Sequence, residues 1–126
     1  MPSSKRRNEN TDNKVARGRR YEKTAALFYE RQGFEILERN WRAGHKEIDL
    51  IAAKDKLLVF VEVKSSSSQK FGHPAERVDR NKIKNLTAAA ERYLLDKNIE
   101  GYDLRFDVVT FTDGRLEHYP NAFECE

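Results

Sequence analysis

The hydrophobic positions of the chain follow a helical period in two segments and favour β-strands in five others. Residues 14–32 carry apolar and small residues at helical spacing and end before Gly33, which predicts a first helix. A second helix is predicted over residues 78–98, and its apolar stripe consists of Ile83, Leu86, Ala90, Tyr93 and Leu94. The β-rich runs are residues 34–41, 46–53, 57–64, 104–112 and 115–119. The pattern therefore predicts an α/β fold class with the element order α-β-β-β-α-β-β.

Two short polar segments predict hairpins. Lys54-Asp55-Lys56 joins the second and third β-rich runs, and Asp113-Gly114 joins the last two. If the first hairpin turns symmetrically about Asp55-Lys56, the numbers of facing residues add up to 111. This register places Asp49 directly opposite Glu62.

The length of 126 residues fits one domain with one hydrophobic core. We expect a disordered basic arm at residues 1–13, a single domain at 14–120 and a tail at 121–126. The longest apolar run, residues 57–61, is far too short to span a bilayer, and the N-terminus shows no apolar signal region. The single cysteine, Cys125, permits no disulfide within the chain. A soluble cytoplasmic protein without membrane contacts is expected.

Basic charge is concentrated at the N-terminus. Residues 1–20 have a net charge of +5, so the rest of the chain carries −2. A basic arm on a near-neutral domain is typical of nucleic-acid binding, because lysine and arginine displace counterions from phosphates. A solvated tail is the simpler interpretation of the charge by itself.

Carboxylates occupy positions where the pattern predicts a core. Leu58, Phe60, Glu62 and Lys64 share one face of the third β-rich run. Asp49, facing Glu62 across the hairpin, would place a second carboxylate about 5 Å away. Two such carboxylates repel unless a cation lies between them, and Mg²⁺ or Mn²⁺ is the cation that oxygen ligands favour. The alternative is that Glu62 and Lys64 pair with each other at an exposed strand end.

A third acidic residue lies on the packing face of the first helix. Glu22 falls within a stripe of small and apolar residues that would face the sheet. It would either form a buried salt bridge or lie beside the metal, as a direct or water-mediated ligand. By contrast, Arg105 and Asp107 alternate with core residues of a strand and are expected to make structural contacts.

These residues resemble the active-site pattern of the PD-(D/E)XK, or restriction-endonuclease-like, nuclease superfamily. Longer strings resemble the bacterial YraN family, which is similar to Holliday-junction resolvases. The strings are Gly18-Arg19-Arg20-Tyr21-Glu22 with Ala25-Ala26, Glu47-Ile48-Asp49-Leu50-Ile51, Val59-Phe60-Val61-Glu62-Val63-Lys64 and Arg105-Phe106-Asp107-Val108-Val109. The chain departs from the family pattern at Lys46, where glycine is usual, and at Ser65-Ser66, where an arginine often follows. The resemblance implies a mixed central sheet flanked by helices.

The resemblance also implies an activity, a Mg²⁺-dependent endonuclease acting on DNA, with branched or junction DNA as one substrate class. Asp49 and Glu62 would bind Mg²⁺ or Mn²⁺ together with the Val63 backbone carbonyl. Lys64 would orient the attacking water and Glu22 would support the metal site.

Apart from Mg²⁺ or Mn²⁺, the resemblance implies no cofactor. Basic side chains on the two predicted helices are candidates for contacts with DNA phosphates. These residues are Arg17, Arg19, Arg20 and Lys82. Because resolvase-like enzymes cut two strands as dimers, a homodimer is a further hypothesis. Two readings without catalysis remain open: a nucleic-acid-binding module, or an accessory protein that depends on a partner and keeps the same fold.

Overall fold

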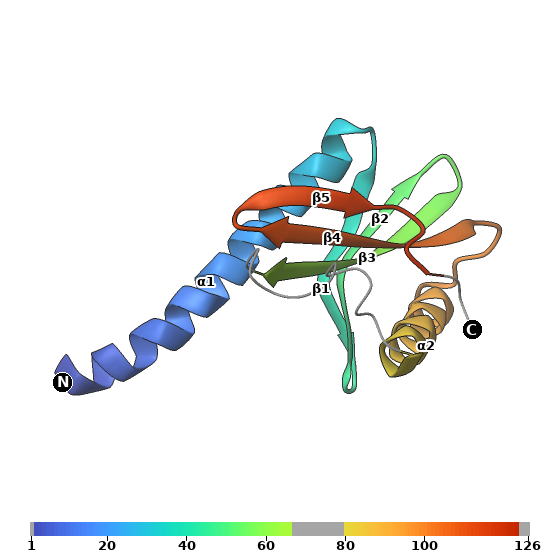
Figure 1. The fold of residues 1–126 in the computed structure, drawn as a ribbon. Helices are drawn as coiled ribbons and strands as arrows, with labels where there is room; N and C mark the ends of the chain where they lie inside the picture. Colours follow the sequence, from blue (N-terminus) through green and yellow to red (C-terminus); the bar gives the residue numbers. More distant parts are fainter. Residues whose placement is uncertain (1, 67–79, 124–126) are drawn as a thin grey trace.

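The computed structural model describes residues 2–66 and 80–123 of the chain (Figure 1). The predicted α/β class and element order are confirmed. The elements are α1 (Pro2–Arg31), β1 (Glu35–Ala43), β2 (Lys46–Lys54), β3 (Leu57–Ser66), α2 (Arg80–Lys97), β4 (Asp103–Thr112) and β5 (Arg115–Tyr119). Neither helix in the described part of the chain is long and apolar enough to cross a membrane.

The five strands form one mixed sheet in the order β1-β2-β3-β4-β5. All neighbouring pairs are antiparallel except β3 and β4, which are parallel and lie on either side of α2 in the sequence. The predicted register of the β2–β3 hairpin is confirmed from Lys54 opposite Leu57 to Leu50 opposite Val61. The turn residues Asp55 and Lys56 both adopt left-handed backbone angles, which match the twist of a two-residue hairpin.

The two helices cover opposite faces of the sheet (Figure 1). Val59 and Val61 point to the face where α1 packs, through a cluster that includes Ala25, Ala26 and Tyr29. Leu58 and Phe60 point to the other face. There they join a cluster with the α2 residues Leu86, Ala89, Ala90 and Tyr93. The alternation along β3 thus places Glu62, which follows Phe60 by two residues, on the α2 face.

The first helix differs from its prediction at the N-terminal end. The sequence predicted disorder over residues 1–13, whereas α1 continues back to Pro2. Once the packed turns near Ala25 and Ala26 exist, each added residue extends a helix rather than nucleating one. Residues 3–17 contain neither glycine nor proline, so no residue in this stretch interrupts the extension. The prediction treated polar composition as sufficient for disorder and omitted this cooperativity.

The sheet divides where the candidate carboxylates lie. The β2–β3 pairing ends at Leu50 and Val61. Beyond this pair β2 continues alongside β1, and β3 continues alongside β4 as far as Ser66. Strict alternation of β2 breaks at the same place, because Ile48 and Ile51 pack into the same core cluster. Asp49 and Glu62 are the first residues beyond the last pair, so a fork opens between the two strands at this point.

A fully satisfied carboxylate, Asp107, lies in β4 and is 1% exposed. Arg105 donates to it at 2.8 and 2.9 Å and the Tyr29 hydroxyl at 2.7 Å. The His118 Nε2 atom lies 2.8 Å from the carboxylate, and the Asn121 backbone N–H donates to it at 3.0 Å. The predicted structural role of Arg105 and Asp107 is therefore matched by a network that ties α1, β4 and β5 together.

Candidate active site

Asp49 fills the fork between β2 and β3. Its Oδ2 atom accepts a hydrogen bond of 2.8 Å from the backbone N–H of Val63. The sequence predicted that Asp49 would face Glu62 directly within the ladder, but the ladder ends one pair earlier. The Asp49 side chain instead supplies an acceptor to β3 at the point where the two strands separate. This contact fixes the carboxylate beside the Glu62-Val63-Lys64 segment.

The environment of Asp49 favours its neutral form. Burial is the largest cause that raises the pKa of Asp49, which reaches about 7, and the hydrogen bond from Val63 opposes this rise. The negative charges of Glu22, Glu62 and Glu47 raise the pKa further. The charges of three other carboxylates, from α1, β2 and β3, therefore act on Asp49 at the fork.

Glu62 is 8% exposed and lies on the α2 face, as its alternation with Leu58 and Phe60 predicted. Its Oε1 atom lies 2.8 Å from the ammonium nitrogen of Lys82 at the start of α2. Its Oε2 atom is buried and has no hydrogen-bond partner in the described part of the chain. Among the described residues, half of this buried carboxylate is therefore unsatisfied, which is costly unless another group binds there.

Glu22 reaches the site from α1. It is partly buried, and its Oε1 atom accepts a 2.9 Å hydrogen bond from the side-chain amide of Asn40 in β1. Asn40 lies between the residues that pair with Leu50 and Ile48, so it is aligned with Asp49 across the strands. It has a φ of 53°, a left-handed angle that asparagine tolerates. Sequence reasoning missed Asn40, and its one local signal is an amide within a β-rich run.

Lys64 follows Glu62 by two residues, and both it and Val63 are partly exposed. In the β3–β4 register Lys64 pairs with Thr110 and Val63 with Val109. This partial exposure leaves part of the Lys64 residue in contact with solvent. The structure thus brings Asp49, Glu62, Val63 and Lys64 to one end of the fork, and the charge of Glu22 acts on the same place.

The candidate phosphate-binding residues fall into two groups. Arg17, Arg19 and Arg20 are exposed on α1. Lys82 is about half exposed and contacts Glu62, so it belongs to the carboxylate site as much as to the surface of α2. The three arginines remain predicted phosphate contacts.

The donor set fits a hard divalent cation in its chemistry. The described residues contain no group of three or more His, Cys, Asp or Glu side chains that could hold a metal ion. The predicted ligands include only two such side chains, Asp49 and Glu62, because the third ligand is the backbone carbonyl of Val63. The Oε2 atom of Glu62, which has no partner in the part of the chain that the structure describes, and the raised pKa of Asp49 are both consistent with oxygen ligands for a cation. Glu22 accepts a hydrogen bond from Asn40, and its negative charge acts on Asp49.

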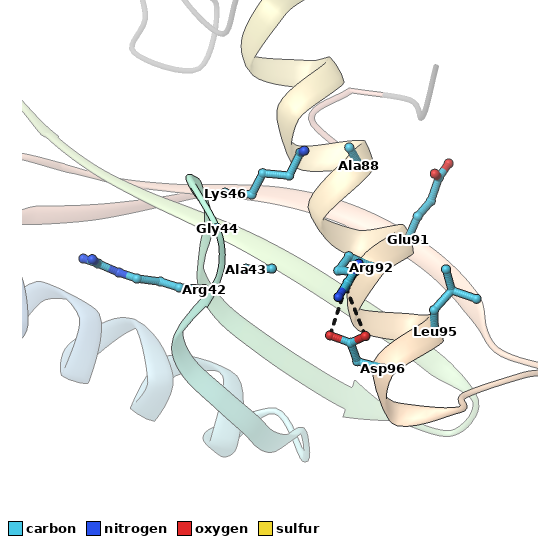
Figure 2. A pocket seen from close by; sticks show the side chains of 9 residues that line it. All are labelled: Arg42, Ala43, Gly44, Lys46, Ala88, Glu91, Arg92, Leu95 and Asp96. Atoms are coloured by element: carbon cyan, nitrogen blue, oxygen red, sulfur yellow. Dashed lines mark hydrogen bonds and ion pairs between the residues drawn. The ribbon is translucent and has the colours of Figure 1, made fainter.

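A cleft of about 630 Å³ lies between the β1–β2 turn and α2 (Figure 2). Its lining comprises Arg42, Ala43, Gly44, Lys46, Ala88, Glu91, Arg92, Leu95 and Asp96. Arg92 and Asp96 bind each other across one turn of α2. None of the candidate catalytic residues lines this cleft. Among its lining residues, Lys46 is the nearest in sequence to Asp49. The cleft is lined by both basic and acidic side chains, so its charge does not indicate which kind of ligand it would bind.

Replacement of Asp49 by asparagine is expected to stabilise the metal-free protein at pH 7.5 by roughly 1–3 kcal/mol. The folded-state pKa of about 7 lies above the ordinary value of 3.8, so ionisation of Asp49 opposes folding. Wild-type stability should fall as pH rises from about 4 to about 7, and the Asp49→Asn protein should lack this loss. The asparagine oxygen can still accept from Val63. Urea unfolding in EDTA across this pH range measures both effects.

Asp103→Asn is the control for this substitution, because Asp103 is exposed at the start of β4. Its unfolding free energy should remain within about 0.5 kcal/mol of wild type. A less stable Asp49→Asn protein at pH 7.5 would show that the carboxylate is a net structural contributor in the absence of metal.

Comparison with other proteins identifies the family. Residues 21–111 match the model of the uncharacterised protein family UPF0102. A UPF0102 protein of Chloroherpeton thalassium is 46% identical over 95 residues, covering 75% of this chain and 74% of its own. A relative from Persephonella marina is 36% identical and covers 87% of this chain and 95% of its own. The matched region contains all the candidate catalytic residues, Glu22, Asp49, Glu62 and Lys64. The chain belongs to the UPF0102 family, which is the YraN family that its motifs resemble.

Proposed function

We propose that this protein is a metal-dependent endonuclease that hydrolyses DNA phosphodiester bonds at the fork between β2 and β3. The observation that carries the proposal is the pairing of two poorly compensated carboxylates with a nearby lysine. Asp49 has a pKa of about 7, Glu62 has a buried oxygen with no hydrogen-bond partner among residues 2–66 and 80–123, and Lys64 follows on the same strand as Glu62. Such an arrangement lowers stability, and its retention is typical of a functional site.

Asp49 and Glu62 would hold Mg²⁺ or Mn²⁺ together with the backbone carbonyl of Val63. When bound, the cation supplies a more acidic water and neutralises charge on the scissile phosphate. The Val63 N–H fixes the Asp49 carboxylate at 2.8 Å, which orients one ligand before the metal arrives. The hydrogen bond from Asn40 holds Glu22, whose charge adds to the negative potential that attracts the cation.

Lys64 would donate hydrogen bonds to the attacking water or to a non-bridging phosphate oxygen. Its positive charge would also offset the negative charge that develops during hydrolysis. The exposed Arg17, Arg19 and Arg20 would bind backbone phosphates, which position DNA without reading its sequence. Branched DNA is the substrate class that the resemblance to Holliday-junction resolvases suggests.

The test compares the wild-type protein with Lys64→Met. Each is incubated with junction, flap, duplex and single-stranded DNA in Mg²⁺, Mn²⁺ or EDTA. Wild-type protein is expected to cut at least one substrate only when metal is present. The methionine variant should bind Mn²⁺ with an affinity within about threefold of wild type but cut at least about 100-fold more slowly. Calorimetry measures the binding and single-turnover kinetics the cutting.

Lys56→Met is the matched control, since Lys56 precedes β3 at the end of the strand away from Lys64. Equal cleavage by wild type and Lys64→Met would point to a contaminating nuclease. Metal binding without cleavage of any of the four substrates would favour the nucleic-acid-binding module. A wild-type protein that binds neither metal would contradict the metal centre itself.

A further inference from the structure

The ion pair between Lys82 and Glu62 places a protein cation at the carboxylate site. Lys82 lies in the first turn of α2, and its ammonium nitrogen is 2.8 Å from Glu62 Oε1. The Glu62 side chain is 10% exposed and that of Lys82 is 48% exposed. One end of this pair is therefore fixed in the core, whereas the other end can move into solvent through a flexible four-carbon chain.

The field of the other carboxylates also acts on Lys82. Its hydrogen bond to Glu62 is the main cause that raises the pKa of Lys82, and the charges of Glu62, Asp49 and Glu47 raise it further. Lys82 is thus charged and close to the same acidic residues that the metal proposal uses. Its ammonium supplies one positive charge where the proposed metal would supply two.

Lys82 satisfies the site only in part. The second oxygen of Glu62 remains buried without a hydrogen-bond partner in the described residues. A single ammonium does not neutralise the cluster, so a divalent cation with several open coordination positions would satisfy it better.

We propose that Lys82 is a resident counter-ion that stabilises Glu62 in the metal-free protein and is displaced from it when a divalent cation binds. This inference rests on the proposed function, because it requires the Asp49–Glu62 site to take a metal. Lys82 is then a positioning residue that lowers metal affinity by competition. The displaced ammonium would move outward, toward the solvent that already covers half of its side chain.

Titration of Mn²⁺ into DNA-free protein by calorimetry tests this competition. Lys82→Met should bind Mn²⁺ about 5- to 20-fold more tightly than wild type, because the metal no longer displaces an ammonium. Lys84→Met is the matched control: Lys84 is exposed on the same helix, and its loss changes the net charge equally. Its affinity should stay within about twofold of wild type. In EDTA the Lys82→Met protein should melt at a lower temperature than wild type, and added Mn²⁺ should raise its melting temperature by more.

Lys82→Arg provides a rescue, because it restores the charge and should return the Mn²⁺ affinity to within about threefold of wild type. The arginine variant also keeps the test decisive if Lys82→Met folds poorly. Much tighter Mn²⁺ binding by Lys82→Arg than by wild type would contradict competition between the Lys82 charge and the metal. Equal or weaker Mn²⁺ binding by Lys82→Met would overturn the role of Lys82 and leave the proposed nuclease intact. Absence of Mn²⁺ binding in all four proteins would overturn both.

Discussion

Glu62→Gln is expected to remove divalent metal binding and DNA cleavage together, with affinity for Mn²⁺ reduced at least about 100-fold and cleavage at least about 1,000-fold. Glutamine retains the size of Glu62 but has one acceptor oxygen and no charge. The buried Oε2 atom, which has no hydrogen-bond partner in the described residues, is the ligand position that the substitution most directly alters. Because outer residues around metal sites already affect affinity about 10- to 100-fold, loss of a ligand should cost more.

Calorimetry with Mn²⁺ and single-turnover cleavage in Mg²⁺ measure the two losses on the same preparation. Glu47→Gln is the control, because Glu47 is exposed near the site and its charge also acts on Asp49. It should weaken Mn²⁺ binding only a few-fold, as expected for a screened charge. Unchanged Mn²⁺ binding by Glu62→Gln would exclude Glu62 as a ligand, even if cleavage were lost.

The sequence was sufficient to predict the element order and the register of the β2–β3 hairpin. The polar turn at Asp55-Lys56 and the alternation of Leu58 and Phe60 are local signals that fix register and face together. Packing then follows, because each sheet face must be covered by an apolar helix face. The extension of α1 to Pro2 was missed because composition was read residue by residue, whereas helix growth is cooperative.

The sequence predicted only part of the geometry around the candidate site residues. Asp49 was expected to face Glu62 within the β2–β3 ladder, but the ladder stops one pair before them. The Asp49 side chain, rather than a backbone carbonyl, accepts the hydrogen bond from the Val63 N–H. The separation of β2 from β3 depends on sheet twist and on the pairing of these strands with β1 and β4. The hydrophobic periodicity of the sequence does not predict either of these. The contacts of Lys82 with Glu62 and of Asn40 with Glu22 join separate elements and leave no spacing signal.

Asp107 has the opposite electrostatics to Asp49. Burial would raise the pKa of Asp107, but hydrogen bonds from His118, Arg105, the Asn121 N–H and Tyr29 outweigh it, and the pKa falls to about 2. The buried Asp107 carboxylate is therefore matched to its surroundings, whereas the partly buried Asp49 carboxylate is not. This contrast separates a structural ion-pair network from the less compensated carboxylate for which we propose a bound cation.

Asp107→Asn is accordingly expected to reduce the free energy of unfolding at pH 7 by about 3–5 kcal/mol. Asparagine has the right shape, but its amide N–H₂ group must face Arg105, His118 or the Tyr29 hydroxyl, which all donate to the carboxylate. At least one buried donor is left without an acceptor, and the charge of Arg105 is no longer compensated. A loss of this size is a large share of the roughly 5–15 kcal/mol that typically holds a small domain folded.

Denaturant unfolding from pH 7 down to pH 2 measures this loss and its origin. Because the folded-state pKa of Asp107 is below the ordinary value of 3.8, its stabilisation is complete above about pH 4 and disappears as pH falls through about 2. The stability difference between wild type and Asp107→Asn should therefore shrink over that range. Asp103→Asn, an exposed position on the same strand, should match wild type throughout. A difference that stays constant down to pH 2 would mean that Asp107 acts through shape alone and that its charge stabilises nothing.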